Sequence, residues 1–238
     1  MTVLHLIRHG RASALEADYD QLHRIGEAQA RLLGEQLGRV REAFDAVYVG
    51  PHKRQLDTLR LMREGATPAG VAWPEATLLE GLAEGPFETL FKVYLRPRIK
   101  LDQVLQAQMD ALKVAADDSA RQLALEAMFD RMVTLWRTGE VHGDDLEPSS
   151  VFTARVTDAK ERIAAQQGAG RRVAVVTSNG VIGELLETLV KVQPPEGRSR
   201  HRFYNTSVTV LELSAAGPAL RALNTTEHLA DPELLTLL

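Results

Sequence analysis

The chain has 238 residues, of which 45% are hydrophobic and 25% charged, and its formal net charge is −4. This length can bury one large core, and the small negative charge gives no indication of a nucleic-acid partner. The sequence contains no cysteine, which excludes disulfides, thiolate nucleophiles and cysteine-ligated zinc. No apolar run is long enough for a membrane helix, and the N-terminus lacks a signal-peptide layout, so we expect a cytoplasmic protein without membrane contact.

Short apolar runs alternate with amphipathic stretches along the chain. Strands are expected at 3–7, 45–49, 77–80, 172–177, 207–213 and 219–223, and helices at 21–37, 52–64 and 149–167. The run at 172–177 is continuous and β-branched, as is typical of a parallel strand buried on both faces. The alternation of strands and helices predicts an α/β fold, a three-layer α/β/α sandwich with a mostly parallel central sheet.

A long helical region without strand signals occupies residues from about 88 to 147 and is interrupted by Pro97. It is too long for a crossover between neighbouring strands, so we expect a helical cap inserted into a single domain of residues 1–238. Its aromatic residues Phe91, Tyr94, Phe129 and Trp136 are expected to form a small core of their own. The acidic stretch 140–147 resembles a set of hard metal ligands, but it lacks a glycine-punctuated calcium loop, so a solvated loop and no metal are favoured.

The most informative residues are Arg8, His9 and Gly10, which follow the first predicted strand. In open α/β sheets, ligands bind at the carboxyl ends of the strands. A guanidinium can hold phosphate oxygens in a fork, and a neutral imidazole can attack phosphorus. This tripeptide therefore suits an anion site in which the imidazole of His9 is available for attack on phosphorus.

Other strand ends carry groups that suit the same chemistry. Arg54 lies at the start of the helix after the second strand, and Asn179 and Gly180 lie at the start of the helix after the fourth. Helix N-termini favour anions through their free N–H groups. Glu80 ends the third predicted strand and supplies a carboxyl group. Because parallel strands share one carboxyl edge, we expect these residues to converge with His9 on one phosphate site.

The order of these motifs resembles that of the histidine phosphatase superfamily, the phosphoglycerate mutase-like group. The matching motifs are Arg8-His9-Gly10, Leu22-x-x-x-Gly26-x-x-Gln29-Ala30, Pro51-x-x-Arg54-x-x-x-Thr58, Leu78-x-Glu80 and Ser178-x-Gly180. The resemblance implies a phosphohistidine intermediate on His9, with phosphate bound by Arg8 and Arg54. It also implies that Glu80 donates a proton to the leaving group, and it implies no metal and no cofactor.

One position departs from the family pattern. Family members usually have a second histidine in the third loop, where this chain has Asn179. The amide donates a neutral hydrogen bond, and loss of a charge-assisted bond costs about 1.5–3 kcal/mol. We therefore expect weakened activity, in a subgroup with asparagine in place of the second catalytic histidine.

Three residues leave alternatives open. Glu84 is a second candidate for the acid, because the family usually has a glycine four residues after the acid and here Gly85 comes one residue later. His52 could lean into the site and partly replace the absent imidazole, or it could face solvent at the start of its helix. His201 lies in a basic stretch and is a further candidate for the site.

These features favour a metal-independent phosphomonoester hydrolase that acts on a small phosphorylated metabolite. A phosphoglycerate mutase is less favoured, because a mutase must hold and return the phosphoryl group and would suffer most from the absent histidine. The alternative is a non-catalytic phosphate-binding or regulatory protein that keeps the arginines without turnover. The sequence indicates neither the substrate nor an oligomeric state.

Overall fold

The computed structural model describes residues 1–13, 20–165 and 170–237. The chain divides into two compact units. The first comprises Met1–Glu84, Arg155–Val192 and Arg202–Leu238, and the second comprises Gly85–Ala154 and Gln193–His201.

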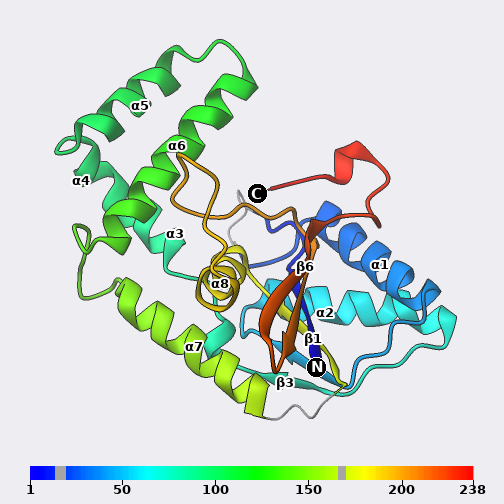
Figure 1. Ribbon diagram of the computed structural model, residues 1–238. Helices are drawn as coiled ribbons and strands as arrows, with labels where there is room; N and C mark the ends of the chain where they lie inside the picture. Colours follow the sequence, from blue (N-terminus) through cyan, green and yellow to red (C-terminus); the bar gives the residue numbers. More distant parts are fainter. Residues whose placement is uncertain (14–19, 166–169, 238) are drawn as a thin grey trace. The chain divides into compact units, whose positions relative to one another are not determined.

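Among the described residues, a six-stranded mixed sheet forms the centre of the first unit (Figure 1). Its strands are β1 (Thr2–Arg8), β2 (Ala46–Val49), β3 (Ala76–Leu78), β4 (Arg172–Thr177), β5 (Val208–Ser214) and β6 (Gly217–Thr225). They lie in the order β3-β2-β4-β1-β5-β6. The first four are parallel to one another, whereas β5 runs antiparallel to both of its neighbours. The predicted α/β class with a mostly parallel sheet is confirmed.

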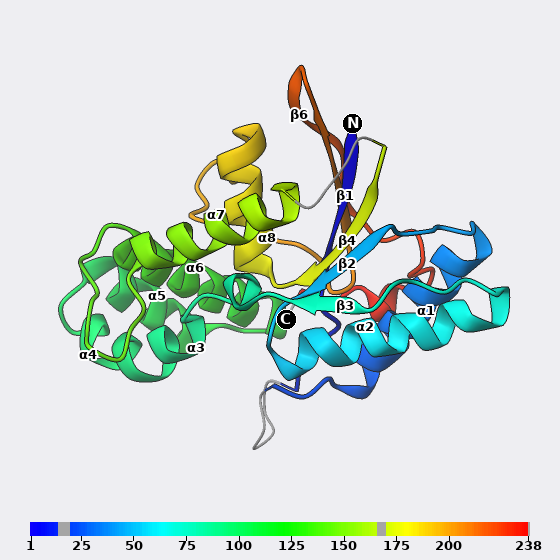
Figure 2. The same ribbon diagram turned by 90° about the horizontal axis from the view of Figure 1, so that it is seen from below.

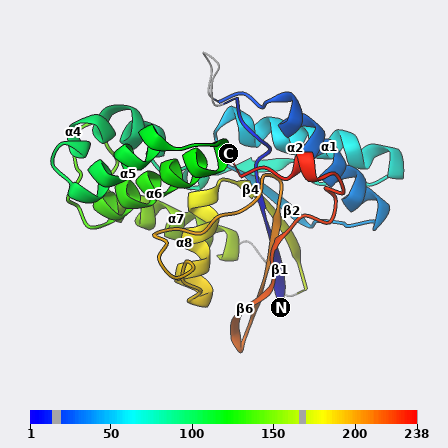
Figure 3. The ribbon, with the colours of Figure 1, turned by 90° about the horizontal axis from the view of Figure 1, so that it is seen from above.

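Helices cover both faces of this sheet (Figure 2 and Figure 3). On one face, α1 (Arg24–Arg39) and α2 (Lys53–Ala66) pack side by side. On the other lie α8 (Asn179–Leu185) and the part of α7 (Ser149–Ala165) that begins at Arg155. The short helices of this unit are η1 (Thr67–Ala69), η2 (Glu80–Leu82), η4 (Leu186–Val190) and η5 (Pro232–Leu234). This arrangement confirms the predicted three-layer α/β/α sandwich.

Close approach of α1 and α2 depends on glycine. A Cβ atom on Gly34 would clash with the carbonyl group of Met62, and a Cβ atom on Gly65 would clash with the carbonyl group of Arg31. Around this contact, alternate strand residues pack against the two helices. The core on this face comprises Ile7, Val47, Val49, Ala174 and Val176 from the strands and Ala30, Leu33, Leu37, Leu59 and Met62 from the helices.

The second unit is helical. Its elements are α3 (Phe87–Thr89), η3 (Leu90–Tyr94), α4 (Leu95–Ile99), α5 (Gln103–Val114), α6 (Asp118–Arg137) and the start of α7. As expected, Phe91, Phe129 and Trp136 belong to an aromatic core of this unit, together with Phe87 and Phe152. The hydroxyl of Tyr94, the fourth residue expected in this core, donates instead to Asp145. The segment Gln193–His201 also belongs to this unit, in addition to the insertion expected from the sequence at about 88–147.

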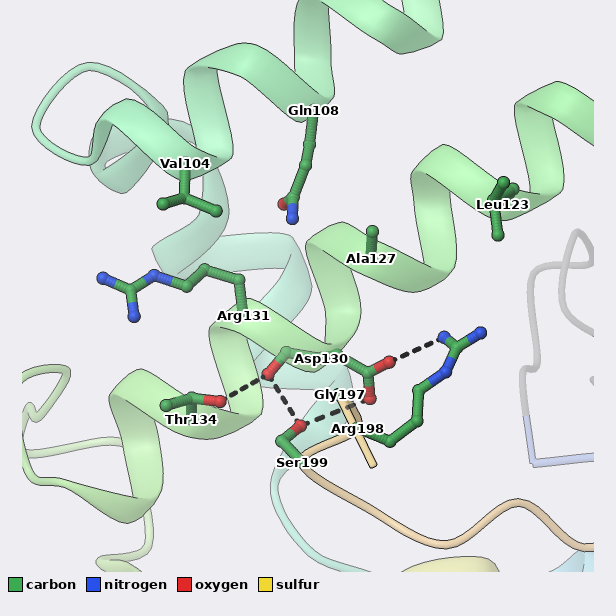
Figure 4. Close-up of a pocket in the computed structure, with 10 residues that line it drawn as sticks. All are labelled: Val104, Gln108, Leu123, Ala127, Asp130, Arg131, Thr134, Gly197, Arg198 and Ser199. Atoms are coloured by element: carbon green, nitrogen blue, oxygen red, sulfur yellow. Dashed lines mark hydrogen bonds and ion pairs between the residues drawn. The ribbon is translucent and has the colours of Figure 1, made fainter. Parts of the chain in front are cut away.

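A cavity of about 560 Å³ lies within the helical unit, between α5, α6 and the segment Gln193–His201 (Figure 4). On its wall, the buried carboxylate of Asp130 accepts hydrogen bonds from Arg198 Nη1 at 2.9 Å and Ser199 Oγ at 3.2 Å. Arg131, also on the wall, donates to Asp102 Oδ2 from Nε at 2.9 Å and from Nη2. These charged groups of the cavity wall are therefore paired within the unit.

The ends of several elements differ from the sequence-based prediction. The helix predicted to begin at 21 begins at Arg24, and the strand predicted at 219–223 extends over Gly217–Thr225. The helix predicted at 149–167 begins at Ser149 as expected, and its predicted last residues lie outside the described residues. None of the described helices is both long and apolar enough to cross a membrane.

Candidate active site

His9 follows β1 at the carboxyl edge of the sheet, and its side chain is buried. Its backbone is held by segments distant in sequence: the N–H donates to the carbonyl of Thr177 at 2.9 Å, and the carbonyl accepts from Asn205 Nδ2 at 3.2 Å. The N–H of Gly10 donates to Thr58 Oγ1 at 3.0 Å. Hydrogen bonds from three other regions of the first unit thus fix the backbone from which the imidazole extends.

The hydrogen bonds of the His9 ring define its tautomer. Nδ1 lies 2.7 Å from the carbonyl oxygen of Gly10, which can only accept, so Nδ1 carries the proton. Nε2 lies 3.2 Å from Nε of Arg54, which can only donate, so Nε2 offers a lone pair. Burial, followed by the charges of Arg54 and Arg8, holds the pKa of His9 well below its usual value. His9 is therefore a neutral imidazole whose Nε2 lone pair is directed at Arg54.

Arg54 lies in the first turn of α2 with its side chain buried. Its Nη1 donates to Asp20 Oδ1 at 2.6 Å. The same carboxylate accepts from the backbone N–H of Lys53 at 2.7 Å and, more weakly, from that of Arg54 at 3.5 Å. A guanidinium and a helix N-terminus are groups that bind phosphate, so a carboxylate of the chain itself lies on anion-binding donors.

Arg8, the last residue of β1, is also buried. Its Nη1 donates to the carbonyl of Phe203 and, at 2.9 Å, to the carbonyl of Leu237. Asn179, the first residue of α8, accepts through Oδ1 from the N–H of Phe203 at 3.0 Å. Phe203 therefore connects Arg8 to Asn179, and the asparagine acts as an acceptor in addition to the donor role expected from the sequence.

The structure brings Glu84, and not Glu80, to the start of α8. Both carboxylate oxygens of Glu84 accept from the N–H of Gly180, at 3.1 and 3.3 Å. Glu80 begins η2 with an exposed side chain, and no hydrogen bond or ion pair joins it to these groups in the part of the chain that the structure describes. We call the side chains of His9, Arg8, Arg54, Asn179 and Glu84, with the N–H of Gly180, the His9 cluster.

Arg155 on α7 holds the turn that carries Glu84. Its guanidinium donates to the carbonyl oxygens of Gly81 at 3.1 Å, Ala83 at 2.7 Å and Glu84 at 3.0 Å. Three bonds from one planar, permanently charged group fix the backbone of this turn. The position of the Glu84 carboxylate therefore depends on α7 as well as on α8.

Gln55 is fully buried on α2, next to Arg54. Its Nε2 donates to Ser178 Oγ at 2.8 Å and to the carbonyl of Leu82 at 3.1 Å, and its Oε1 accepts from the N–H of His52 at 3.0 Å. Gln55 thus connects the start of α2, the start of α8 and the turn at Leu82. The sequence alone does not identify Gln55, because a glutamine on an amphipathic helix gives no signal that it is buried.

The two remaining histidine candidates differ in position. His52 is the N-cap residue of α2, and its Nδ1 lies 3.9 Å from Asp20 Oδ2. Burial, followed by the charge of Arg54, lowers its pKa, so the neutral ring is favoured there. His201 belongs to the helical unit. Within residues 1–13, 20–165 and 170–237, no three histidine, aspartate or glutamate side chains are grouped to hold a metal ion.

The His9 cluster combines groups that act on an oxyanion. A neutral imidazole offers a lone pair, guanidinium groups offer charge-assisted N–H donors, and the start of α8 offers backbone N–H groups. A carboxyl group at the same helix start can exchange a proton. These are the elements of a site for nucleophilic attack on a phosphoryl group.

Comparison with solved structures identifies proteins of the same fold. A phosphoserine phosphatase mutant from Entamoeba histolytica in complex with phosphoserine is 19% identical, with a TM-score of 0.61 over 96% of this chain and 100% of that chain. A phosphoglycerate mutase from Bacillus anthracis is 20% identical, with a TM-score of 0.61 over 96% and 95% of the two chains. A putative alpha-ribazole-5'-P phosphatase from Escherichia coli is 19% identical, with a TM-score of 0.63 over 95% and 98%. At these identities, the likeness shows the fold alone.

Sequence comparison adds the family. No curated protein sequence matches the chain significantly. The model of the histidine phosphatase superfamily (branch 1) matches residues 4–93 and 120–226, which is most of the chain and includes every member of the His9 cluster. The chain therefore belongs to the histidine phosphatase superfamily (branch 1).

Proposed function

We propose that the protein is a metal-independent phosphomonoester hydrolase that forms a phosphohistidine on Nε2 of His9. The observation that carries this proposal is the tautomer of His9, whose Nδ1–H is held by the carbonyl of Gly10. The depressed pKa keeps the ring neutral, so Nε2 is a nucleophile at neutral pH. Family membership and the phosphatases among proteins of the same fold support the assignment.

In the first half-reaction, Nε2 of His9 attacks phosphorus and the bond between phosphorus and the ester oxygen breaks. The Nε–H of Arg54, which donates to Nε2 in the resting site, turns to a phosphoryl oxygen and releases the lone pair. Arg54 and Arg8 then stabilise the charge on the transferring group. The substrate is a small phosphorylated metabolite.

We assign the proton-donor role to Glu84 instead of Glu80, because Glu84 reaches the N–H of Gly180 whereas Glu80 is exposed. The protonated carboxyl group gives its proton to the leaving oxygen. In the second half-reaction, the resulting carboxylate takes a proton from water as the water oxygen attacks the phosphohistidine. Inorganic phosphate leaves, and both His9 and the carboxyl group return to their starting states.

We also propose that turnover is weak and that the chain belongs to a subgroup with asparagine, here Asn179, in place of the second catalytic histidine. Asn179 supplies a neutral donor to the phosphoryl group where an imidazolium would be charged, and removal of one oxyanion donor typically costs about 100- to 1,000-fold in rate. Its Oδ1 is already used by the N–H of Phe203, which ties the side chain to a positioning role. We therefore expect slow hydrolysis.

Turnover of p-nitrophenyl phosphate in the presence of EDTA tests the proposal. We expect wild-type activity that His9→Ala abolishes, together with an acid-labile phosphoprotein that this variant does not form. Glu84→Gln is expected to lower kcat by about 100-fold or more, the range of general acid–base catalysis. The matched Glu80→Gln variant is expected to keep wild-type kcat, and the reverse order of these two variants would return the acid role to Glu80.

A non-catalytic phosphate-binding protein is the second candidate, and the observation that favours it is Asn179 in place of a histidine. Such a protein would bind inorganic phosphate in calorimetry yet show the same p-nitrophenyl phosphate turnover as His9→Ala. If only Asn179→His were active, the binding function would replace the enzymatic one.

A further inference from the structure

The carboxylate of Asp20 lies on the phosphate-binding donors of α2. Its oxygens accept from Arg54 Nη1 at 2.6 Å and from the backbone N–H groups of Lys53 and Arg54 at 2.7 and 3.5 Å. It also lies 3.9 Å from Nδ1 of His52. Asp20 precedes this helix by more than thirty residues in the sequence, so the contact is formed by tertiary structure and not by local capping.

The two partners of this ion pair differ in exposure. The side chain of Arg54 is 7% exposed, whereas that of Asp20 is 32% exposed. Withdrawal of Asp20 would return a carboxylate to water, where it is well solvated, whereas the buried guanidinium of Arg54 would lose a charge-assisted hydrogen bond. The arrangement therefore favours replacement of the carboxylate by another anion over dissociation of the pair without replacement.

The guanidinium of Arg54 donates hydrogen bonds to both Asp20 and His9, the proposed nucleophile. While Nη1 of Arg54 donates to Asp20, its Nε donates to Nε2 of His9 and occupies the lone pair. A phosphoryl group bound at the start of α2 would compete with Asp20 for Nη1 and for the N–H of Lys53. Its arrival would also draw the Nε–H of Arg54 away from His9.

We propose that Asp20 is an internal competitor of the phosphoryl group, which sets the affinity of the site and keeps Arg54 on His9 until an anion displaces it. This inference rests on the phosphate site of the proposed function. Asp20 is a positioning and specificity-determining residue here, because it acts through Arg54 and not on the reacting atoms. A ligand with two negative charges on one phosphoryl group displaces a single carboxylate more effectively than a singly charged anion does.

Calorimetric titration of the full chain with inorganic phosphate tests this role. Asp20→Asn keeps the size of the side chain and removes its charge, and we expect phosphate to bind about tenfold more tightly, equivalent to about 1.4 kcal/mol. Asp57→Asn is the matched control: it removes one negative charge from the same helix, where Asp57 pairs with Lys53 and Arg60 at the surface. We expect its phosphate affinity to stay within about twofold of wild type, the ordinary effect of a rim charge under salt screening.

Unchanged or weaker phosphate binding by Asp20→Asn would overturn the inference, and so would equal gains in both variants. If Asp20→Asn does not fold, the carboxyl ¹³C resonance of Asp20 in the wild type replaces it: a shift on phosphate addition supports displacement, and no shift overturns it. The phosphate affinity of Asp20→Asn can be measured independently of whether the protein hydrolyses a phosphate ester. Tighter phosphate binding without any p-nitrophenyl phosphate turnover would sustain the inference and reject the enzyme, whereas turnover without tighter binding would do the opposite.

Discussion

The His9 imidazole has cations for neighbours, and these act on it in two ways. Burial, followed by the charges of Arg54 and Arg8, lowers the pKa of His9 and disfavours the imidazolium, so the ring keeps its lone pair. In the proposed reaction, the same cations stabilise the phosphoryl oxygens. One set of charges would thus serve both the neutral His9 of the resting site and the transition state of the proposed transfer.

The first prediction concerns this electrostatic effect. Arg54→Gln removes the nearest cation, so the pKa of His9 should rise toward its usual value, because the imidazolium is no longer repelled. Titration of ¹³C-labelled histidine by NMR measures it. Arg60→Gln, on the exposed part of the same helix, serves as the control and should leave the pKa unchanged. A His9 pKa that stays the same or falls in Arg54→Gln would refute this account.

The sequence could indicate those site residues that are fixed by strand ends. His9, Arg8, Arg54 and Asn179 follow or end predicted strands or begin helices, and secondary structure alone brings such residues to one sheet edge. The proposed acid could not be placed in this way, because both candidates, Glu80 and Glu84, lie in one turn a few residues apart. Only the tertiary structure shows which of the two carboxylates reaches the start of α8.

At the scale of elements, the turn before the helical unit depends on a side chain from elsewhere in the sequence. The turn from Gly81 to Glu84 is held by three bonds from Arg155 on α7. The sequence predicted α7 as an amphipathic helix but gave no sign that one of its arginines binds backbone carbonyls of a turn. Periodicity reports which face of a helix is apolar, not which polar residue finds a buried partner. The same limit explains why Gln55 was missed.

The second prediction follows from this contact. Arg155→Met keeps the long aliphatic stem and removes the three N–H donors, so the carbonyls of the turn lose their partners and the Glu84 carboxylate is less well positioned. We expect kcat for p-nitrophenyl phosphate to fall about tenfold, the effect of a misplaced proton donor, with smaller change in KM. Arg162→Met on the exposed side of α7 is the control and should retain wild-type kcat. Equal kcat values in the two variants would contradict the positioning role.

The whole molecule contains buried histidines that must remain neutral. Burial lowers the pKa of His5, which also faces the charge of Arg172, to about 4, and it lowers the pKa of His228 to about 4. Between their usual value near 6.5 and these values, the unfolded chain binds more protons than the folded one. Folding stability from these groups is therefore fully present above pH 6.5 and is lost as the pH falls toward 4.

The third prediction is a measurable loss of stability in mild acid. Each of these histidines lowers the free energy of unfolding by up to about 1.4 kcal/mol per pH unit in this window. Urea denaturation at pH 7.5 and pH 5 should show the loss, and His228→Gln should reduce it because one titrating group is removed. A free energy of unfolding that is the same at both pH values would show that these histidines are not held neutral.

The position of β1 in the sheet has a consequence for how the chain acquires its structure. Val3 pairs with Arg172 on one side and Thr2 pairs with Leu213 on the other, so the earliest strand lies between partners from the distant end of the sequence. During synthesis, this apolar strand emerges from the ribosome long before either neighbour exists, and its edges remain open to wrong pairing. Folding dominated by such non-local pairs is slow, because long loops must close before the contacts form. The proposed nucleophile, His9, directly follows this strand, so the nascent chain can assemble the His9 cluster only after β4 and β5 have been made.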